Sequence, residues 1–177
     1  MSNPLVVVVD LDGFQHGPDE LTPKCLAVAC DALQLASQWI FQTGFLASRP
    51  REHLSTYYHQ STFVHGLPLT GPGLPQGVFP HVLRNALDEL IIDYYRSSPV
   101  APAPDHFLLF TKGATKLELF EDALSDTPLL LPVECRNLEL MHCPTVAQLA
   151  PEAAGRIVPT QFKATEYAIW LAGQGLS

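Results

Sequence analysis

The hydrophobic pattern of the first fifty residues is typical of β-strands. Residues 5–9 form an unbroken run of leucine and valine that ends at Asp10, as in a strand buried on both faces near the centre of a sheet. Residues 24–32 and 38–45 are two further strand-like runs, and short polar segments separate the three. Because short connections join antiparallel neighbours, the chain is predicted to begin with three antiparallel strands.

After residue 50 the pattern changes to helices that alternate with strands. Pro50 opens a short helix, and residues 78–95 carry apolar side chains at helical spacing. Two more strands are predicted at residues 106–110 and 129–133, and three helices at residues 115–124, 145–150 and 160–171. Strands that alternate with helices become parallel neighbours through right-handed crossovers. We therefore expect one α/β domain over residues 1–177, with a mixed sheet of three antiparallel and then two parallel strands.

The composition is that of a folded but acidic chain. Of the 177 residues, 47% are hydrophobic and 16% are charged, which is enough apolar material for one core. The formal charge is -8, with ten lysines and arginines that form no cluster along the sequence. Affinity for nucleic acid comes largely from clustered cations, so the charge favours a protein partner or a homo-oligomer over nucleic acid.

The first residues lack the features of a secretory signal. Residues 1–9 carry neither a basic segment nor a long apolar core, and no apolar run approaches the ~20 residues that a membrane helix needs. We therefore expect an intracellular protein, cytoplasmic or nuclear, that does not contact a membrane. In that setting the four cysteines are expected to be reduced: Cys25, Cys30, Cys135 and Cys143.

Five short segments spread over the chain carry a family resemblance. In order, they are residues 6–14 (VVVVDLDGF), residues 65–67 (HGL) before Gly71, residues 107–116 (FLLFTKGATK), residues 138–144 (LELMHCP) with Leu149, and residues 167–171 (YAIWL). This ordered set resembles the RNase H-like 3′-to-5′ exonucleases of the DEDDh type, on a branch near the Maelstrom domain. The resemblance implies an RNase H-like fold, whose order of strands and helices is the one predicted above.

The resemblance also implies that the metal site of such enzymes is degenerate here. In active relatives, four acids and a histidine hold two divalent metal ions that activate water. Asp10 and Asp12 match the first acid pair, although the family prefers glutamate in place of Asp12; as alternate residues of one strand they face the same side. Lys116 stands at the position of the second acid, and Lys163 lies near that of the last. A lysine repels a metal ion.

Two functions are compatible with this remnant. In the first, no cofactor is bound, and Lys116 and Lys163 replace the metals by forming ion pairs with the strand-end acids. The protein is then an inactive exonuclease-like module that binds a protein partner or itself, in a process related to nucleic acids, viruses or transposons. In the second, a nuclease retains Mg²⁺ or Mn²⁺ on Asp10, Asp12 and a third acid. The candidates for that acid are Glu118, Glu121 and Glu166.

Simpler interpretations and other chemistries stay open for the same residues. Asp10 and Asp12 are also explained as structural acids at the end of a strand, whose carboxylates accept hydrogen bonds from backbone amides or from a lysine. Residues 10–13 (DLDG) resemble the nucleophile motif of HAD-like phosphatases, but Phe14 departs from that motif and those enzymes need a helix directly after the first strand.

Two further features of the sequence are a conceivable metal site and two candidate contact surfaces. Cys135, His142 and Cys143 are possible zinc ligands, although their spacing matches no known zinc finger. The apolar, proline-rich segments 66–80 and 99–104 are candidate contact surfaces.

Overall fold

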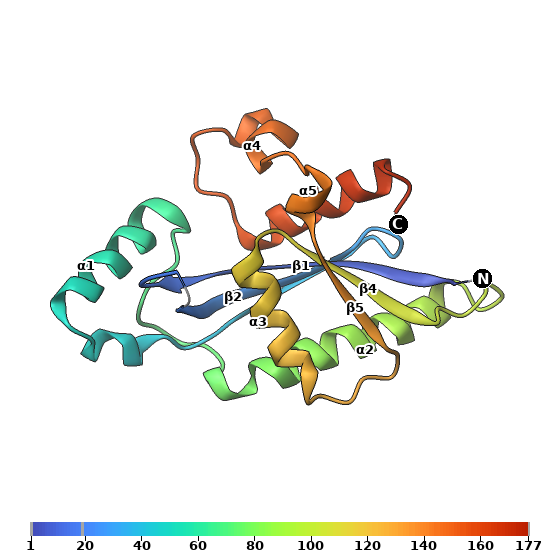
Figure 1. The fold of residues 1–177 in the computed structure, drawn as a ribbon, viewed down its shortest axis with the longest axis horizontal. Coiled ribbons are helices and arrows are strands. Elements are labelled where there is room, and N and C mark those ends of the chain that lie inside the picture. The colour runs from blue at the N-terminus through green and yellow to red at the C-terminus, as the bar shows by residue number, and fades with distance from the viewer. Residues whose placement is uncertain (1, 19, 177) are drawn as a thin grey trace.

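The computed structural model describes residues 2–18 and 20–176, and a five-stranded mixed sheet forms its centre (Figure 1). The strands are β1 (Pro4–Gln15), β2 (Leu21–Cys30), β3 (Leu35–Ile40), β4 (His106–Thr111) and β5 (Val133–Asn137). Their order across the sheet is β3-β2-β1-β4-β5; β1, β2 and β3 are antiparallel neighbours, whereas β4 runs parallel to β1 and β5 parallel to β4. The predicted α/β class and mixed sheet are confirmed, with β1 at the centre.

Helices cover both faces of this sheet. They are α1 (Arg51–His59), which continues as a π-helical turn (Gln60–Val64), α2 (Phe79–Ser97), α3 (Ala114–Ser125), α4 (Val146–Leu149) and α5 (Thr160–Gly173). In Figure 1, α2 and α3 lie on one side of the sheet, α4 and α5 lie on the other, and α1 lies beyond one end of β1 and β2. Within the described ranges, no helix has the length and apolar character needed to cross a membrane.

The central strand β1 divides the hydrophobic core into two layers. Its odd-numbered residues, including Val7 and Val9, pack against α2 and α3, and its even-numbered residues Val6 and Val8 pack against α5. Each fully buried side chain of this size contributes about 1.5–3 kcal/mol. Because side chains alternate along a strand, Asp10 and Asp12 continue the even-numbered row and face the same side as α5.

Two strand predictions are wrong in position, and both concern edge strands. The third strand spans 35–40 rather than 38–45, because the chain leaves the sheet at Phe41 and forms a 3₁₀-helix at Gly44–Ser48. The fifth spans 133–137 rather than 129–133. An edge strand is only half buried, so its hydrophobic signal is weaker than that of the neighbouring leucine-rich loop, which also packs on the core.

Gly13 allows β1 and β2 to stay in contact where their register shifts. The pairing of the two strands is irregular between Asp12 and Gly13, where Gly13 lies opposite Pro23. Such a bulge bends the strand and redirects the side chains that follow. Beyond it, β1 continues to Phe14, which forms a small core cluster with Leu46, Leu69 and Tyr57 of α1.

Replacing Gly13 with alanine should destabilise the fold. A β-carbon there would lie 2.1 Å from the Thr22 carbonyl oxygen, so the two strands would have to move apart. We expect Gly13→Ala to lower the free energy of unfolding by about 3 kcal/mol in a urea titration. The matched control is Gly77→Ala, whose added carbon meets nothing within 4 Å and should change the value by less than about 0.5 kcal/mol. Equal unfolding energies for the two variants would contradict this close approach.

Candidate functional site

Two acids of β1 lie near the points where α3 and α5 begin. Asp10 is only 2% exposed, and its Oδ1 atom accepts a hydrogen bond of 2.9 Å from the Leu11 amide. Asp12 is also largely buried, and its Oδ2 atom accepts a hydrogen bond of 2.7 Å from the Thr160 hydroxyl. Buried carboxylates require compensating charges as well as hydrogen bonds.

Two lysines supply those charges. Lys116 Nζ donates a hydrogen bond of 2.7 Å to Asp10 Oδ1. Lys163 Nζ donates one of 2.7 Å to Asp12 Oδ1 and lies 3.5 Å from Asp10 Oδ2. The structure thus brings together the four residues that the sequence nominated, in a network of two carboxylates and two ammonium groups.

The local backbone structure positions each lysine next to the acids. The chain leaves β4 at Thr111 and passes through Gly113, whose φ of 119° suits glycine, into the first turn of α3, which carries Lys116. Asn137 at the end of β5 holds this turn, because its Oδ1 atom accepts a hydrogen bond of 3.0 Å from the Gly113 amide. Lys163 lies one turn into α5, on the same helix face as Thr160.

The ion pair between Asp12 and Lys163 shifts the pKa values of its two members in opposite directions. Burial by itself would raise the pKa of Asp12, but the charge and hydrogen bond of Lys163 and the hydroxyl of Thr160 outweigh it, and the pKa lies below its usual value. Burial by itself would lower the pKa of Lys163, but the charges of Asp10 and Asp12 outweigh it, and the pKa is raised. Asp12 and Lys163 are therefore both charged near pH 7.

The network opens into a groove of about 570 Å³, which we call the lysine groove. Its wall includes Lys112, Lys116 and Lys163, together with Asp12, His65, Glu139 and the first turn of α3. Lys112 follows β4 directly; its Nζ atom donates a hydrogen bond of 2.7 Å to the Pro144 carbonyl and lies 5.2 Å from the centre of the Tyr167 ring. Three lysine side chains therefore line the groove.

His65 also contributes to the lysine groove, and it is only 6% exposed. Its Nδ1 atom accepts a hydrogen bond of 3.0 Å from the Leu67 amide, so the neutral ring carries its hydrogen on Nε2. Burial lowers the pKa of His65, which favours this neutral form. The Nε2 atom is buried near the Gly13 backbone and makes no well-aligned hydrogen bond among the described residues.

Two residues of the site, Thr160 and Lys112, are not predicted from the sequence. Thr160 stands three positions before Lys163 on α5, and that helical spacing was a usable signal. Lys112 had no comparable signal, because its place depends on the contact between the end of β4 and Pro144.

The three candidate third acids do not join the network. Glu118 and Glu121 are exposed on α3, and Glu166 is partly buried on α5. In the parts of the chain that the structure describes, no hydrogen bond or ion pair links any of them to Asp10 or Asp12, and no three acids, histidines or cysteines lie close enough to hold a metal ion.

The possible zinc ligands are separated by the sheet. Cys143 is buried in the layer beneath α5, whereas Cys135 packs against the opposite layer, next to α2 and α3. Burial and the nearby Glu121 and Glu134 raise the pKa of Cys135 to about 11, so its thiol stays protonated. The two cysteines therefore do not form one zinc site. All four cysteines of the chain are free.

The start of the sheet also differs from the arrangement that the phosphatase alternative requires. β1 is followed directly by β2, its antiparallel partner, and not by a helix.

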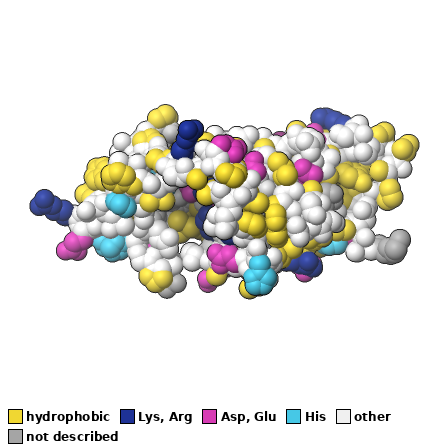
Figure 2. Space-filling model, turned by 90° about the horizontal axis from the view of Figure 1, so that it is seen from above, with side chains coloured by type: hydrophobic (Ala, Val, Ile, Leu, Met, Phe, Trp, Pro, Cys, Tyr) yellow, Lys and Arg dark blue, Asp and Glu magenta, His cyan; other side chains and the backbone are white. Residues whose placement is uncertain are grey.

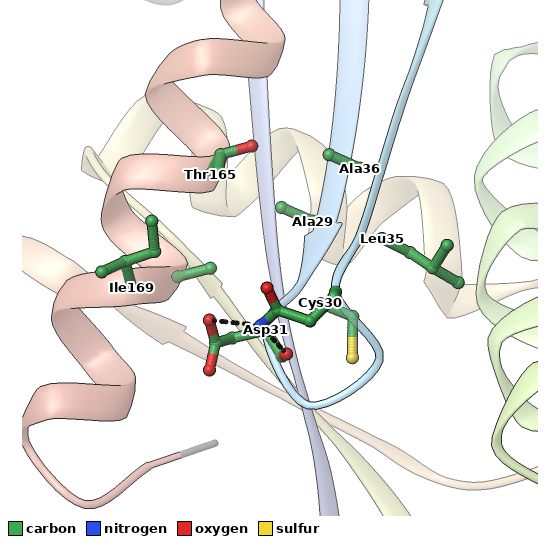
Figure 3. Close-up of a pocket in the computed structure, with 9 residues that line it drawn as sticks. Ala29, Cys30, Asp31, Leu35, Ala36, Thr165 and Ile169 are labelled. Carbon is green, nitrogen blue, oxygen red and sulfur yellow. Dashed lines mark hydrogen bonds between the residues drawn. The ribbon is translucent and has the colours of Figure 1, made fainter. Parts of the chain in front are cut away.

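A second, smaller pocket lies between the β2–β3 turn and α5 (Figure 3). It has a volume of about 110 Å³, and most of its wall is apolar or small, including Leu35, Ala36 and Ile169. Its polar groups bind one another: Gln34 Nε2 donates hydrogen bonds to the Asp31 carbonyl at 2.6 Å and to Asp31 Oδ1 at 3.1 Å. The lysine groove, where charged groups converge, is therefore the candidate functional site.

No model of a known protein family and no curated protein matches this chain.

Removing one ammonium group should be costly. Lys163→Met leaves Asp10 and Asp12 largely buried with Lys116 as their remaining cation, and we expect the free energy of unfolding at pH 7 to fall by about 3–5 kcal/mol. The double variant Asp12→Asn/Lys163→Met removes a charge of each sign and should recover much of that loss in a double-mutant cycle. A cost below about 1 kcal/mol for Lys163→Met would mean that the pair behaves like an exposed one.

The stability of the same variant should depend on pH. The lowered pKa of Asp12 gives the wild type a stabilisation that is present above the unfolded value of about 3.9 and is lost as pH falls through the folded value. Burial is the largest single influence on this pKa, and Lys163 provides two of the influences that oppose it. Without Lys163 we therefore expect the pKa of Asp12 to rise, so that protonation of Asp12 relieves the penalty. We expect Lys163→Met to approach wild-type stability as pH falls from 7 to 5, measured by urea unfolding at each pH. A gap that stays constant over this range would contradict the shift.

Proposed function

We propose that this protein is a catalytically inactive, exonuclease-like module of the RNase H-like class, which acts by binding rather than by cleavage. The order of its strands and helices supports the class, and so does an acid pair on the central strand. One observation supports the proposed loss of catalysis: an ammonium group lies 2.7 Å from each of these two acids. Positive charge is thus supplied by the chain itself.

The ammonium groups compete directly with metal binding. Mg²⁺ requires near-octahedral oxygen ligands at about 2.1 Å. Both oxygens of Asp12 accept hydrogen bonds from Lys163 and Thr160, and Asp10 Oδ1 accepts them from Lys116 and the Leu11 amide. A metal ion would have to displace both lysines and leave their charges unpaired in a largely buried site, which is unfavourable.

A protein partner or a second copy of the chain is the binding partner that we propose. The net charge is -8, and two of the ten cationic side chains are engaged by Asp10 and Asp12. Figure 2 shows lysine and arginine on one face as separated spots rather than a continuous basic stripe. These features support a protein partner over nucleic acid. The family resemblance is what suggests a process related to nucleic acids, viruses or transposons.

Of the two proline-rich segments, the shorter one is better placed for contact. Segment 66–80 buries Leu69 and Phe79 in the core, whereas Val100 in segment 99–104 is 97% exposed. Four free thiols suit the intracellular setting that the proposal includes.

Restoring acids should restore metal binding. In Lys116→Glu/Lys163→Asp, four carboxylates would meet without cations, so the apo protein should be destabilised and Mn²⁺ should raise its melting temperature. The wild type should show no such rise and no heat of Mn²⁺ binding in calorimetry. The matched control is Arg84→Glu/Arg96→Glu on α2, which makes the same charge change away from the site and should not respond to Mn²⁺.

Two results would reverse the proposal. One is saturable Mg²⁺ or Mn²⁺ binding to the metal-stripped wild type that is lost in Asp10→Asn/Asp12→Asn. The other is Mn²⁺-dependent degradation of single-stranded DNA or RNA that Asp10→Ala abolishes.

A further inference from the structure

The lysine groove contains more hydrogen-bond donors than acceptors. An ammonium group carries three donor hydrogens, and Lys116 uses one on Asp10 while its side chain stays 27% exposed. Lys112 uses one on the Pro144 carbonyl. His65 adds no reachable donor, because its Nε2 atom is itself buried near the Gly13 backbone. The two lysines therefore leave several N–H groups for a ligand.

The start of α3 adds further donors to the same wall. The first amides of a helix have no partner within it and carry a partial positive charge that attracts anions. Gly113 donates its amide to Asn137, but Ala114 and Thr115 follow as the first residues of a helix of twelve, and both line the groove. A helix start with this geometry suits a bound anion when neighbouring side chains also supply donors.

The acids of the groove do not balance these donors. Both oxygens of Asp12 already accept hydrogen bonds. Glu139 is the other acid on the wall; it is exposed and lies beside Gly113, where its negative charge opposes an incoming anion. A ligand that fits must therefore be rich in acceptors, and compact enough to reach ammonium and amide groups together.

We propose that the lysine groove binds a phosphate group directly, without a metal ion. A phosphate has acceptor oxygens in a tetrahedral arrangement and pairs well with lysine and with helix amides. Lys112 and the exposed side of Lys116 contact the phosphate oxygens, together with the Ala114 and Thr115 amides. This inference rests on the proposed function, because it requires Lys116 and Lys163 to remain on the acids in place of metal ions.

The test is a titration of the full chain in a buffer with EDTA, followed by amide NMR. The probes are inorganic phosphate and a nucleoside 5′-monophosphate, with the unphosphorylated nucleoside as control. We expect saturable shifts of the Ala114 and Thr115 amides with both phosphates and none with the nucleoside. If the monophosphate binds at least about tenfold more tightly than inorganic phosphate, the source is a nucleotide; equal affinities indicate a simple phosphate.

Two variants should change the phosphate affinity in opposite directions, and a third serves as their control. Lys112→Gln removes a cation outside the Asp10 and Asp12 network and should weaken phosphate binding about three- to fivefold. Glu139→Gln removes the opposing charge at an exposed position and should strengthen binding by a similar factor. Arg84→Gln on α2 is the matched control and should leave the affinity unchanged. Loss of fold cannot produce the gain expected for Glu139→Gln, so that variant separates binding from stability.

Three outcomes would overturn the inference, and they are distinct from failure of the proposed function. The absence of saturable shifts up to about 10 mM phosphate would overturn the site, as would binding of the unphosphorylated nucleoside alone. The site would also be overturned if neither Lys112→Gln nor Glu139→Gln changed the phosphate affinity. None of these three outcomes would contradict the proposed inactive module. Phosphate binding that requires Mg²⁺ or Mn²⁺, and that Asp10→Asn/Asp12→Asn abolishes, would instead overturn the proposed function.

Discussion

The burial of two carboxylates on the central strand is the constraint on which this structure depends. Asp10 and Asp12 lie in the same row as the valines that pack against α5, where an unpaired charge would be strongly destabilising. The two lysines that compensate them stand 106 and 151 positions away along the chain. Their ion pairs therefore tie β1 to the first turns of both α3 and α5, which otherwise cover opposite faces of the sheet.

The same pairing determines which chemistry is available at this end of the sheet. Buried ion pairs contribute little net stability compared with apolar packing, but removing one partner is costly. Single substitutions in such a network are therefore destabilising. Both oxygens of Asp12 and the Oδ1 atom of Asp10 already accept hydrogen bonds, as the proposed loss of metal binding requires. Beside the network, the lysine groove is lined by Lys112, Lys116 and the first residues of α3.

The groove is also defined by elements that meet only in three dimensions. The bulge at Gly13 extends β1 toward α1, where Phe14 contacts the ring of His65 edge-on, with ring centres 4.9 Å apart. Asn137 holds the turn that starts α3, and Pro144 accepts the hydrogen bond of Lys112. Small loops from distant parts of the chain thus set the shape of the lysine groove, while the sheet fixes the positions of its acids.

The sequence by itself determined the order of the elements, the mixed sheet and the central place of β1, because unbroken or helical hydrophobic periodicity marks elements that are well buried. It also placed Asp10 and Asp12 on one face through their alternate spacing, and the family resemblance nominated Lys116 and Lys163 beside them. It misplaced β3 and β5, since edge strands carry only half the hydrophobic signal. Only the tertiary structure decided that both lysines reach the acids, that Cys135 and Cys143 lie on opposite sides of the sheet, and that His65 and Lys112 join the groove. These facts depend on contacts between residues far apart in sequence, which no local pattern encodes.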